Sequence, residues 1–307
     1  MTPTTLTNSN IKLQKVSDDS DVPLTAQGVT GNNQTVTFTH ADLVDTTQYK
    51  IIINPSQIKD INGNAISAST SQIISTFSTA DSTPPTVSNV IPTNGATNQS
   101  KTPAITLTFS KAMDQSTLTS ANIMLATSGG GAVSGYTVNC DTSNHVATLN
   151  LTGALAEQTS YKLSINQQNV KDTSGNAMGS NSSYLVSQFT TGDFTAPTLS
   201  STIPVNGATS VATESPISLT FSESMDTTTL STTTIKLQKV SDSSYVNLNS
   251  PSYSNGNKMV TFQPSANLLG GESYNIIINP SQIKDLAGNP MSAGSSQTVS
   301  NYYVINV

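Results

Sequence analysis

The chain repeats itself with a period of about 112 residues. The segment Met113–Leu118 (MDQSTL) returns as Met225–Leu230 (MDTTTL), and Ile91–Thr97 (IPTNGAT) returns as Ile203–Thr209 (IPVNGAT). Solenoid proteins repeat about every 20 to 50 residues, whereas the longer period found here is typical of an independent domain. The sequence therefore predicts several similar domains in a row.

Three copies of the repeat are recognisable, and two of them are closely related. The hexapeptide Lys-Asp-x-x-Gly-Asn occurs at residues 59–64, 171–176 and 284–289. The segment Ile11–Asp18 (IKLQKVSD) is identical to Ile235–Asp242, which indicates a recent duplication. We predict domains at residues 1–80, 81–192 and 193–307.

The first copy is expected to be incomplete. Met1 has the same position in the repeat as Met113 and Met225, so residues 1–80 lack the counterpart of residues 81–112. A fragment, an internal start or a shortened expression form would each explain this, so the missing signal peptide carries no information about localisation. Without its first strands, such a repeat leaves one core face open and one edge unpaired. Poor order, pairing with a neighbouring molecule and aggregation are the three expected outcomes.

Short segments with alternating apolar and polar residues predict the fold. In the third copy we expect strands at Ile217–Ser222, Ile235–Val240, Lys258–Phe262, Ser273–Ile278 and Thr298–Val304. The tripeptide Asn255–Asn257 favours a tight hairpin, because Asn-Gly adopts positive φ easily. Helix-forming residues never run together over a dozen positions, charged residues make up only 10% of the chain, and there is no Trp. The predicted fold is all-β: an elongated array of tandem immunoglobulin-like Greek-key β-sandwiches.

Four motifs in a fixed order carry a family resemblance. They are Asp-x-Thr-x-Pro-Thr, Pro-x-Asn-Gly-Ala-Thr, Phe-Ser-x-x-Met-Asp and Lys-Asp-x-x-Gly-Asn. Together they resemble the bacterial Ig-like domain found in SbsA-type S-layer proteins, over essentially the whole chain. The resemblance implies a sandwich fold and a role as a spacer, adhesin segment or surface-layer module. It implies no particular ligand, because this family serves many surface proteins and also accompanies secreted enzymes.

The sequence offers no catalytic constellation. His40 and His145 lie at non-equivalent positions of different repeats, and Gly129–Gly131 lacks the Lys-Ser/Thr of a phosphate-binding loop. Cys140 is the only cysteine, which excludes an intramolecular disulfide. The net charge is −6 and the basic residues are scattered, so no nucleic-acid partner is expected. No apolar run is long enough to span a membrane. We predict that the protein is not an enzyme.

The Lys-Asp-x-x-Gly-Asn loop allows two interpretations. In the first it is a plain turn, with the Asp capping backbone amides and the Gly in the left-handed conformation. In the second it contributes oxygen ligands to Ca²⁺, together with an aspartate of a linker. The candidate ligands are Asp60, Asn64, Asp172, Asn176, Asp285 and Asn289 in the loops, and Asp81 and Asp193 in the linkers. Calcium, the one cofactor considered, would then stiffen a hinge between domains.

The repeat architecture favours a structural function. We predict a spacer or adhesin-stalk segment of a bacterial extracellular or cell-surface protein, with other surface proteins or polymers as partners. One alternative is a glycan- or polymer-binding accessory module of a larger secreted protein, to which Tyr245, Tyr253, Tyr302 and Tyr303 would contribute. Another is a filament subunit that self-associates by strand complementation through the first repeat. The segment 301–307 is a conceivable donor, although it is more simply the last strand of its own repeat.

Overall fold

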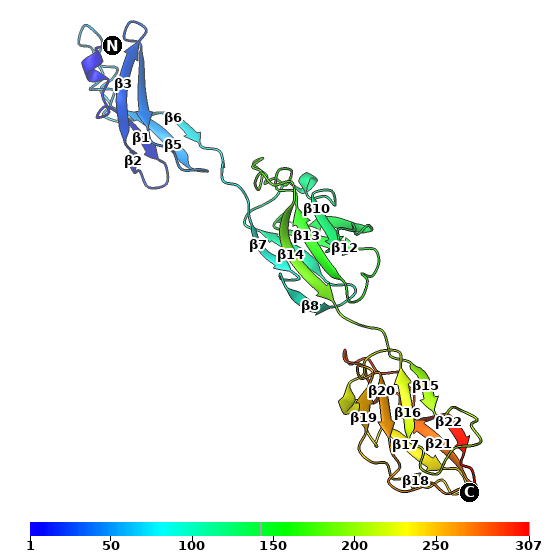
Figure 1. The fold of residues 1–307 in the computed structure, drawn as a ribbon. Coiled ribbons are helices and arrows are strands. Elements are labelled where there is room, and N and C mark those ends of the chain that lie inside the picture. Colours follow the sequence, from blue (N-terminus) through cyan, green and yellow to red (C-terminus); the bar gives the residue numbers. More distant parts are fainter. Residues whose placement is uncertain (142, 307) are drawn as a thin grey trace. The chain divides into compact units, whose positions relative to one another are not determined.

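The computed structural model of the protein describes residues 1–141 and 143–306 (Figure 1). The last residue of the predicted third domain, Val307, lies outside the described residues. Strands dominate the chain, and the described helices are three short 3-10 turns: η1 (Pro3–Thr5), η2 (Gln115–Thr117) and η3 (Thr227–Thr229). None of the described helices is long and apolar enough to span a membrane. The protein is all-β.

The second repeat forms two four-stranded sheets. One has the order β10-β13-β14-β8 and the other β11-β12-β9-β7. The strands are β7 (Val87–Ile91), β8 (Ala96–Gln99), β9 (Ile105–Phe109), β10 (Ile123–Thr127), β11 (Tyr136–Cys140), β12 (Val146–Leu151), β13 (Ser160–Ile165) and β14 (Tyr184–Thr191). Alternate residues of β9 and β13 are buried, as expected for strands that each turn one face to a shared core.

The third repeat also forms two four-stranded sheets, with the orders β15-β16-β20-β19 and β18-β17-β21-β22. Its strands are β15 (Leu199–Ile203), β16 (Ile217–Phe221), β17 (Ile235–Lys239), β18 (Tyr245–Val246), β19 (Ser252–Ser254), β20 (Met259–Phe262), β21 (Ser273–Ile278) and β22 (Gln297–Tyr303). The strands predicted from alternation are confirmed, with ends that differ by one residue at most. The predicted hairpin turn is also confirmed, since Asn255, Gly256 and Asn257 have φ values of 51°, 62° and 64°.

The core of the third repeat lies between its two sheets. Ile217 and Leu219 of β16 and Ile276 and Ile278 of β21 are fully buried in one apolar cluster. Burying an aliphatic side chain of this size stabilises a fold by about 1.5–3 kcal/mol. Met225 also belongs to this cluster, directly before Asp226, whose carboxylate accepts a hydrogen bond from the backbone amide of Thr228 and so caps η3.

The described part of residues 1–80 holds one four-stranded sheet and one hairpin. The sheet has the order β2-β1-β5-β6, and β3 pairs only with β4. The strands are β1 (Ile11–Lys15), β2 (Asp21–Val22), β3 (Leu24–Thr30), β4 (Thr35–His40), β5 (Gln48–Ile53) and β6 (Gln72–Ser78). Every residue of β6 is exposed, in contrast to β14 and β22, which bury alternate residues near their ends.

Candidate functional site

The Lys-Asp-x-x-Gly-Asn loop forms the same turn in all three repeats. In the second repeat, Oδ1 of Asp172 accepts hydrogen bonds from the backbone amides of Ser174 and Asn176, both at 2.9 Å. Its Oδ2 accepts a third bond from the side-chain amide of Asn176 at 3.0 Å. Gly175 has a φ of 89°, a conformation that favours glycine. The turn interpretation of these residues therefore describes their local structure correctly.

The buried loop carboxylate of the second repeat faces an ammonium group. Lys111 lies with its Nζ 2.8 Å from Oδ2 of the linker residue Asp81 and 3.6 Å from Oδ2 of Asp172. Asp172 is 1% exposed. Its burial opposes ionisation, but the hydrogen bonds from Asn176 and Ser174 and the charge of Lys111 together hold the pKa of the carboxyl below its ordinary value. The linker aspartate and the loop thus share one positive charge.

The third repeat replaces that lysine with an acid. Glu223 has the position of Lys111 in the Phe-Ser-x-x-Met-Asp motif. The ligand oxygens of Asp193, Glu223 and Asp285 all lie within 4.8 Å of one another. Asp285 is 1% exposed, and the other two are half-buried. Burial, together with the charges of Asp193 and Asp285, raises the pKa of the Glu223 carboxyl. Three carboxylates therefore gather where the second repeat has two carboxylates and a cation.

Oxygen donors of this kind fit a divalent cation. Ca²⁺ takes six to eight oxygens at about 2.3–2.6 Å, and carboxylates bind it through one or both oxygens. Asp193, Glu223 and Asp285 would be the charged ligands, and water would complete the shell. Of the predicted calcium ligands, Asp193 and Asp285 are thus brought together, and Glu223 joins them.

The other predicted ligands have structural partners. Asn289 donates its side-chain amide to Oδ2 of Asp285 at 2.8 Å and to the linker carbonyls of Asp193 and Thr195, both at 3.3 Å. Asn176 likewise donates to the carbonyl of Asp81 at 3.1 Å. Both asparagines therefore fix the linker to the loop of the repeat that follows it.

The first-repeat loop has no linker beside it in the described residues. Asp60 accepts from the backbone amides of Asn62 and Asn64 at 2.9 and 2.8 Å, and from the Asn64 side chain at 2.9 Å. These bonds hold the pKa of the Asp60 carboxyl below its ordinary value. Asp60 and Asn64 form the same turn as their counterparts, without a second carboxylate.

A second pair of equivalent carboxylates binds the linkers from the preceding repeat. Glu157 accepts hydrogen bonds from Lys101 Nζ at 2.7 Å, from the Phe194 amide at 2.9 Å and from the Thr195 hydroxyl at 2.8 Å. These bonds lower the pKa of Glu157 to about 2. Asp45, which lies 112 positions earlier, accepts corresponding bonds from Ser82 and Thr83 at 2.8–3.0 Å.

The tyrosines considered for sugar stacking are dispersed by the fold. Tyr302 is 1% exposed in the core, whereas Tyr303, the next residue of β22, points outward. The hydroxyl of Tyr253 donates to backbone carbonyls of Thr227 and Leu230, and the ring of Tyr245 lies 4.9 Å from Lys236 Nζ.

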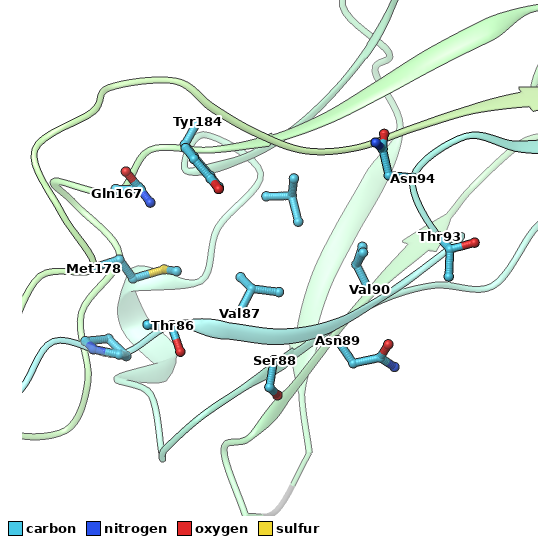
Figure 2. A pocket seen from close by; sticks show the side chains of 12 residues that line it. Thr86, Val87, Ser88, Asn89, Val90, Thr93, Asn94, Gln167, Met178 and Tyr184 are labelled. Carbon is cyan, nitrogen blue, oxygen red and sulfur yellow. The ribbon is translucent and has the colours of Figure 1, made fainter.

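A surface hollow of about 480 Å³ lies on the second repeat, along β7 and the start of β14 (Figure 2). Val87, Val90, Met178 and Tyr184 supply its apolar wall, and Gln167 lies at its rim. Its described lining carries no charged side chain and one aromatic ring. The Oε1 atom of Gln167 already accepts a hydrogen bond from Asn181 at 3.1 Å. The hollow is thus uncharged, and the side chains of Thr86, Ser88, Asn89, Thr93 and Asn94 lie beside its apolar wall.

Comparison with known proteins gives one specific result. A family model of the bacterial Ig-like domain matches the chain twice, over residues 81–191 and 193–302. None of the curated proteins matches the chain.

Solved structures resemble the chain more distantly. The N-terminal part of the bacterial S-layer protein SbsC aligns over 73% of this chain and 45% of that chain, with 15% identity and a TM-score of 0.28. The chain thus spans less than half of that structure. Chicken CNTN1 FN1–FN3 domains align over 95% and 91%, with 14% identity and a TM-score of 0.29. Native alpha-2-macroglobulin from Escherichia coli, spanning MG0-NIE-MG1, aligns over 71% of both chains, with 13% identity and a TM-score of 0.29.

Proposed function

Because the chain belongs to the bacterial Ig-like domain family, which matches most of its length, we propose that it is a non-catalytic spacer. It would serve as a stalk segment of an extracellular bacterial surface protein, whether an adhesin or a surface-layer protein. Its partners would be the surface proteins or polymers that the stalk carries or contacts.

The observation that carries this proposal is the way in which both linkers are held. Glu157 binds the second linker through two donors, the Phe194 amide and the Thr195 hydroxyl, and Asn289 binds the linker carbonyls from the repeat that follows. Asp45 and Asn176 do the same for the first linker. Proline residues within both linkers restrict φ further. A spacer benefits from such restraint, because a flexible linker would lose the distance that the repeats provide.

The width of a distance distribution tests the spacer proposal. Spin labels would be attached at Thr137→Cys and Ser254→Cys, both exposed strand residues, in a Cys140→Ser background. We expect a narrow distribution for this protein and a clearly broader one after Glu157→Gln and Asn289→Ala. Asp242→Asn is the matched control, because Asp242 pairs with Lys239 away from the linker. A distribution that is broad from the start, and unchanged by the linker variants, would contradict the proposal.

We also propose that the third repeat binds one divalent cation, Ca²⁺ above all, through Asp193, Glu223 and Asp285. The comparison with the second repeat favours this function, since the ammonium of Lys111 lies against the corresponding aspartates there. A bound cation would neutralise a cluster whose carboxylates otherwise repel one another. It would also attach the linker residue Asp193 to the buried loop.

Titration calorimetry of the full chain with CaCl₂ tests the cation proposal. We expect one site per chain, and no binding after Glu223→Lys. The variant Lys111→Met is the matched control: it removes a charge at the equivalent position of the second repeat and should leave this site intact. Equal heats of calcium binding for Glu223→Lys and the unaltered protein would mean that calcium does not bind at Asp193, Glu223 and Asp285, which would contradict the proposal.

A further inference from the structure

The hollow on the second repeat lies between the edge strand β7 and the start of β14 (Figure 2). In the described part of this repeat, β7 pairs with β9 alone. The segment that leads into β8 joins β14 at Gln188, where the Gly95 amide lies 2.7 Å from the Gln188 carbonyl. Tyr184, the first residue of β14, lies before this contact. The hollow is therefore formed by the fold of the second repeat itself, where its two sheets separate.

Two side-chain amides at the hollow have their oxygens engaged and their NH₂ groups free. Oδ1 of Asn94 accepts a hydrogen bond from the backbone amide of Gln188 at 2.9 Å, and Oε1 of Gln167 accepts one from Asn181 at 3.1 Å. Neither NH₂ group donates to another group within residues 1–141 and 143–306. Because each amide is oriented through its oxygen, each NH₂ group is a fixed donor that suits an acceptor oxygen of a ligand.

Tyr184 adds an exposed aromatic ring to these donors. The side chain is 47% exposed, and its hydroxyl has no hydrogen-bond partner in the described part of the chain. In Figure 2, Tyr184 and Gln167 lie across the hollow from Asn94. Val87 and Val90 point from β7 into the space between them. The hollow thus combines an aromatic ring, an apolar wall and separate hydrogen-bond donors.

The third repeat keeps the packing residues of this region but lacks three of the others. The shared positions are Val87, Asn94 and Met178, with the counterparts Leu199, Asn206 and Met291. The positions that differ are Thr93, Gln167 and Tyr184, which are replaced by Val205, Pro280 and Gln297. The first repeat has the same proline and glutamine, at Pro55 and Gln72. The fold of a repeat therefore does not require Gln167 or Tyr184, which favours a role for them outside packing.

The chemistry of the lining favours a neutral ligand that has both apolar and polar faces. Its described part holds no charged side chain, and the chain has a net charge of −6, so an anion would meet no compensating cation. The volume of about 480 Å³ lies in the range of small-molecule sites. A sugar ring fits this description, because its C–H face stacks on an aromatic ring and its oxygens accept hydrogen bonds. The valines and the methionine suit a methyl group better than another hydroxyl, which they would leave unpaired.

An extended peptide is the alternative occupant, because the outer edge of β7 is open among the described residues. However, a β-bulge between Val87 and Asn89 interrupts this edge, and bulges hinder the addition of a further strand. Main-chain pairing would also make no use of the free NH₂ groups or of the exposed ring. A small ligand therefore accounts for more of the lining.

We propose that this hollow binds a neutral sugar that carries an acetamido group. The ring of Tyr184 would stack on the pyranose ring, and the acetamido methyl would pack against Val87 and Met178. The NH₂ groups of Asn94 and Gln167 would donate to the hydroxyl and carbonyl oxygens of the ligand. The second repeat would then bind a glycan in addition to acting as a spacer, and this site does not depend on the spacer function or on calcium.

NMR titration of the ¹⁵N-labelled full chain with N,N′-diacetylchitobiose tests the proposal. We expect saturable shift changes that include the side-chain amides of Asn94 and Gln167. Cellobiose, which has the same linkage but no acetamido groups, should bind at least about tenfold more weakly, because the methyl contact and the carbonyl acceptor are lost. Absence of saturable changes with diacetylchitobiose would overturn the proposal, and equal binding of the two sugars would overturn the assigned ligand class.

Variants of the exposed tyrosines locate the site. Tyr184→Gln introduces the residue found in the other two repeats and should weaken diacetylchitobiose binding at least about tenfold. Tyr245→Gln is the matched control, because Tyr245 is exposed on the third repeat, and it should leave binding unchanged. The backbone spectrum reports whether each variant keeps its fold. Unchanged binding in Tyr184→Gln, or binding of an alternating valine–threonine peptide in place of the sugar, would overturn the proposal.

Discussion

Substitution of Glu223 tests whether the three carboxylates of the third repeat, those of Asp193, Glu223 and Asp285, destabilise it by repelling one another. Glu223→Gln removes one negative charge, and Glu223→Lys reproduces the arrangement that Lys111 makes in the second repeat. In metal-free buffer at neutral pH, we expect both variants to unfold at a higher temperature than the unaltered protein, with Glu223→Lys the more stable of the two. A gain in stability from replacing a half-buried residue is unusual, since most substitutions destabilise.

The magnitude follows from the separation of the charges. Two like charges 4.8 Å apart repel by about 3.5 kcal/mol at an effective dielectric constant of 20, and by about 1 kcal/mol in bulk water. Because Asp193 and Glu223 are half-exposed, the value per pair lies near the lower limit. Removing the charge of Glu223 relieves its repulsion with both Asp193 and Asp285, so we expect Glu223→Gln to stabilise the third repeat by about 2–3 kcal/mol. At about 4 °C per kcal/mol, Tm should rise by about 8–12 °C.

Scanning calorimetry of the full chain, in EDTA and in millimolar calcium, makes the measurement. Calcium at a hundred times its Kd should stabilise the unaltered third repeat by about 2.7 kcal/mol and Glu223→Lys not at all. Lys111→Glu, which gives the second repeat the same three acids, should make that repeat calcium-responsive. If Glu223→Gln lowers Tm in EDTA, and calcium leaves the unaltered protein unchanged, then the electrostatic reasoning is wrong.

Three further predictions concern the folds and the linkers. Met225→Ala should cost the third repeat about 2–5 kcal/mol, because Met225 is fully buried, and should lower only that calorimetric transition. Ser300→Ala should lower the free energy of unfolding of the third repeat by about 1 kcal/mol, because the buried Ser300 hydroxyl donates to the Pro204 carbonyl at 2.9 Å. Ser75→Ala, at the exposed equivalent position, is the control and should change that free energy by less than about 0.5 kcal/mol when both variants are unfolded in denaturant. Since the folded-state pKa of Glu157 is depressed from 4.5 to about 2, its contribution is complete above pH 4.5 and is lost as the pH falls toward 2. Unfolding followed across that window should be less pH-dependent in Glu157→Gln; an identical profile would mean that the linker bonds do not form in solution.

The sequence predicted the strands well because alternation reports directly on burial. Apolar and polar residues alternate along Ile217–Phe221, and every second residue of Ser273–Ile278 is buried. Both strands are internal, with a hydrogen-bonded strand on each side. The same reasoning applied to Tyr302 and Tyr303 would have separated them, because adjacent strand residues point to opposite faces. The prediction that Tyr302 and Tyr303 share one surface overlooked the two-residue alternation of side chains along a strand.

The candidate site was predicted only in part, for an identifiable reason. A search for residues that recur in every repeat finds Asp172 and Asp285 but passes over position 111, where lysine alternates with glutamate. It also passes over Asp45 and Glu157, whose counterpart in the third repeat is Gly270. Contacts between a linker and residues some distance away along the chain depend on tertiary structure. The sequence did contain one signal for this site, namely the change from Lys111 to Glu223 at equivalent positions of two otherwise similar motifs.

That change of charge suggests how one fold produces linkers with different properties. In the second repeat the positive charge is part of the chain, so the bond between Asp81, Lys111 and Asp172 forms whenever the repeat folds. In the third repeat the same position holds Glu223, and burial together with the charges of Asp193 and Asp285 raises the pKa of its carboxyl. The folded-state pKa of Glu223 lies above its ordinary value of 4.5. In the absence of metal, the third repeat should therefore lose stability as the pH rises from 4.5 through the folded-state pKa. This effect is opposite in sign to that of Glu157. If a divalent cation binds there, stability should instead rise with pH in calcium, because the cation binds the deprotonated carboxylates, and should fall with pH in EDTA. A single substitution per repeat would thus decide whether a linker is fixed permanently or only where calcium is present.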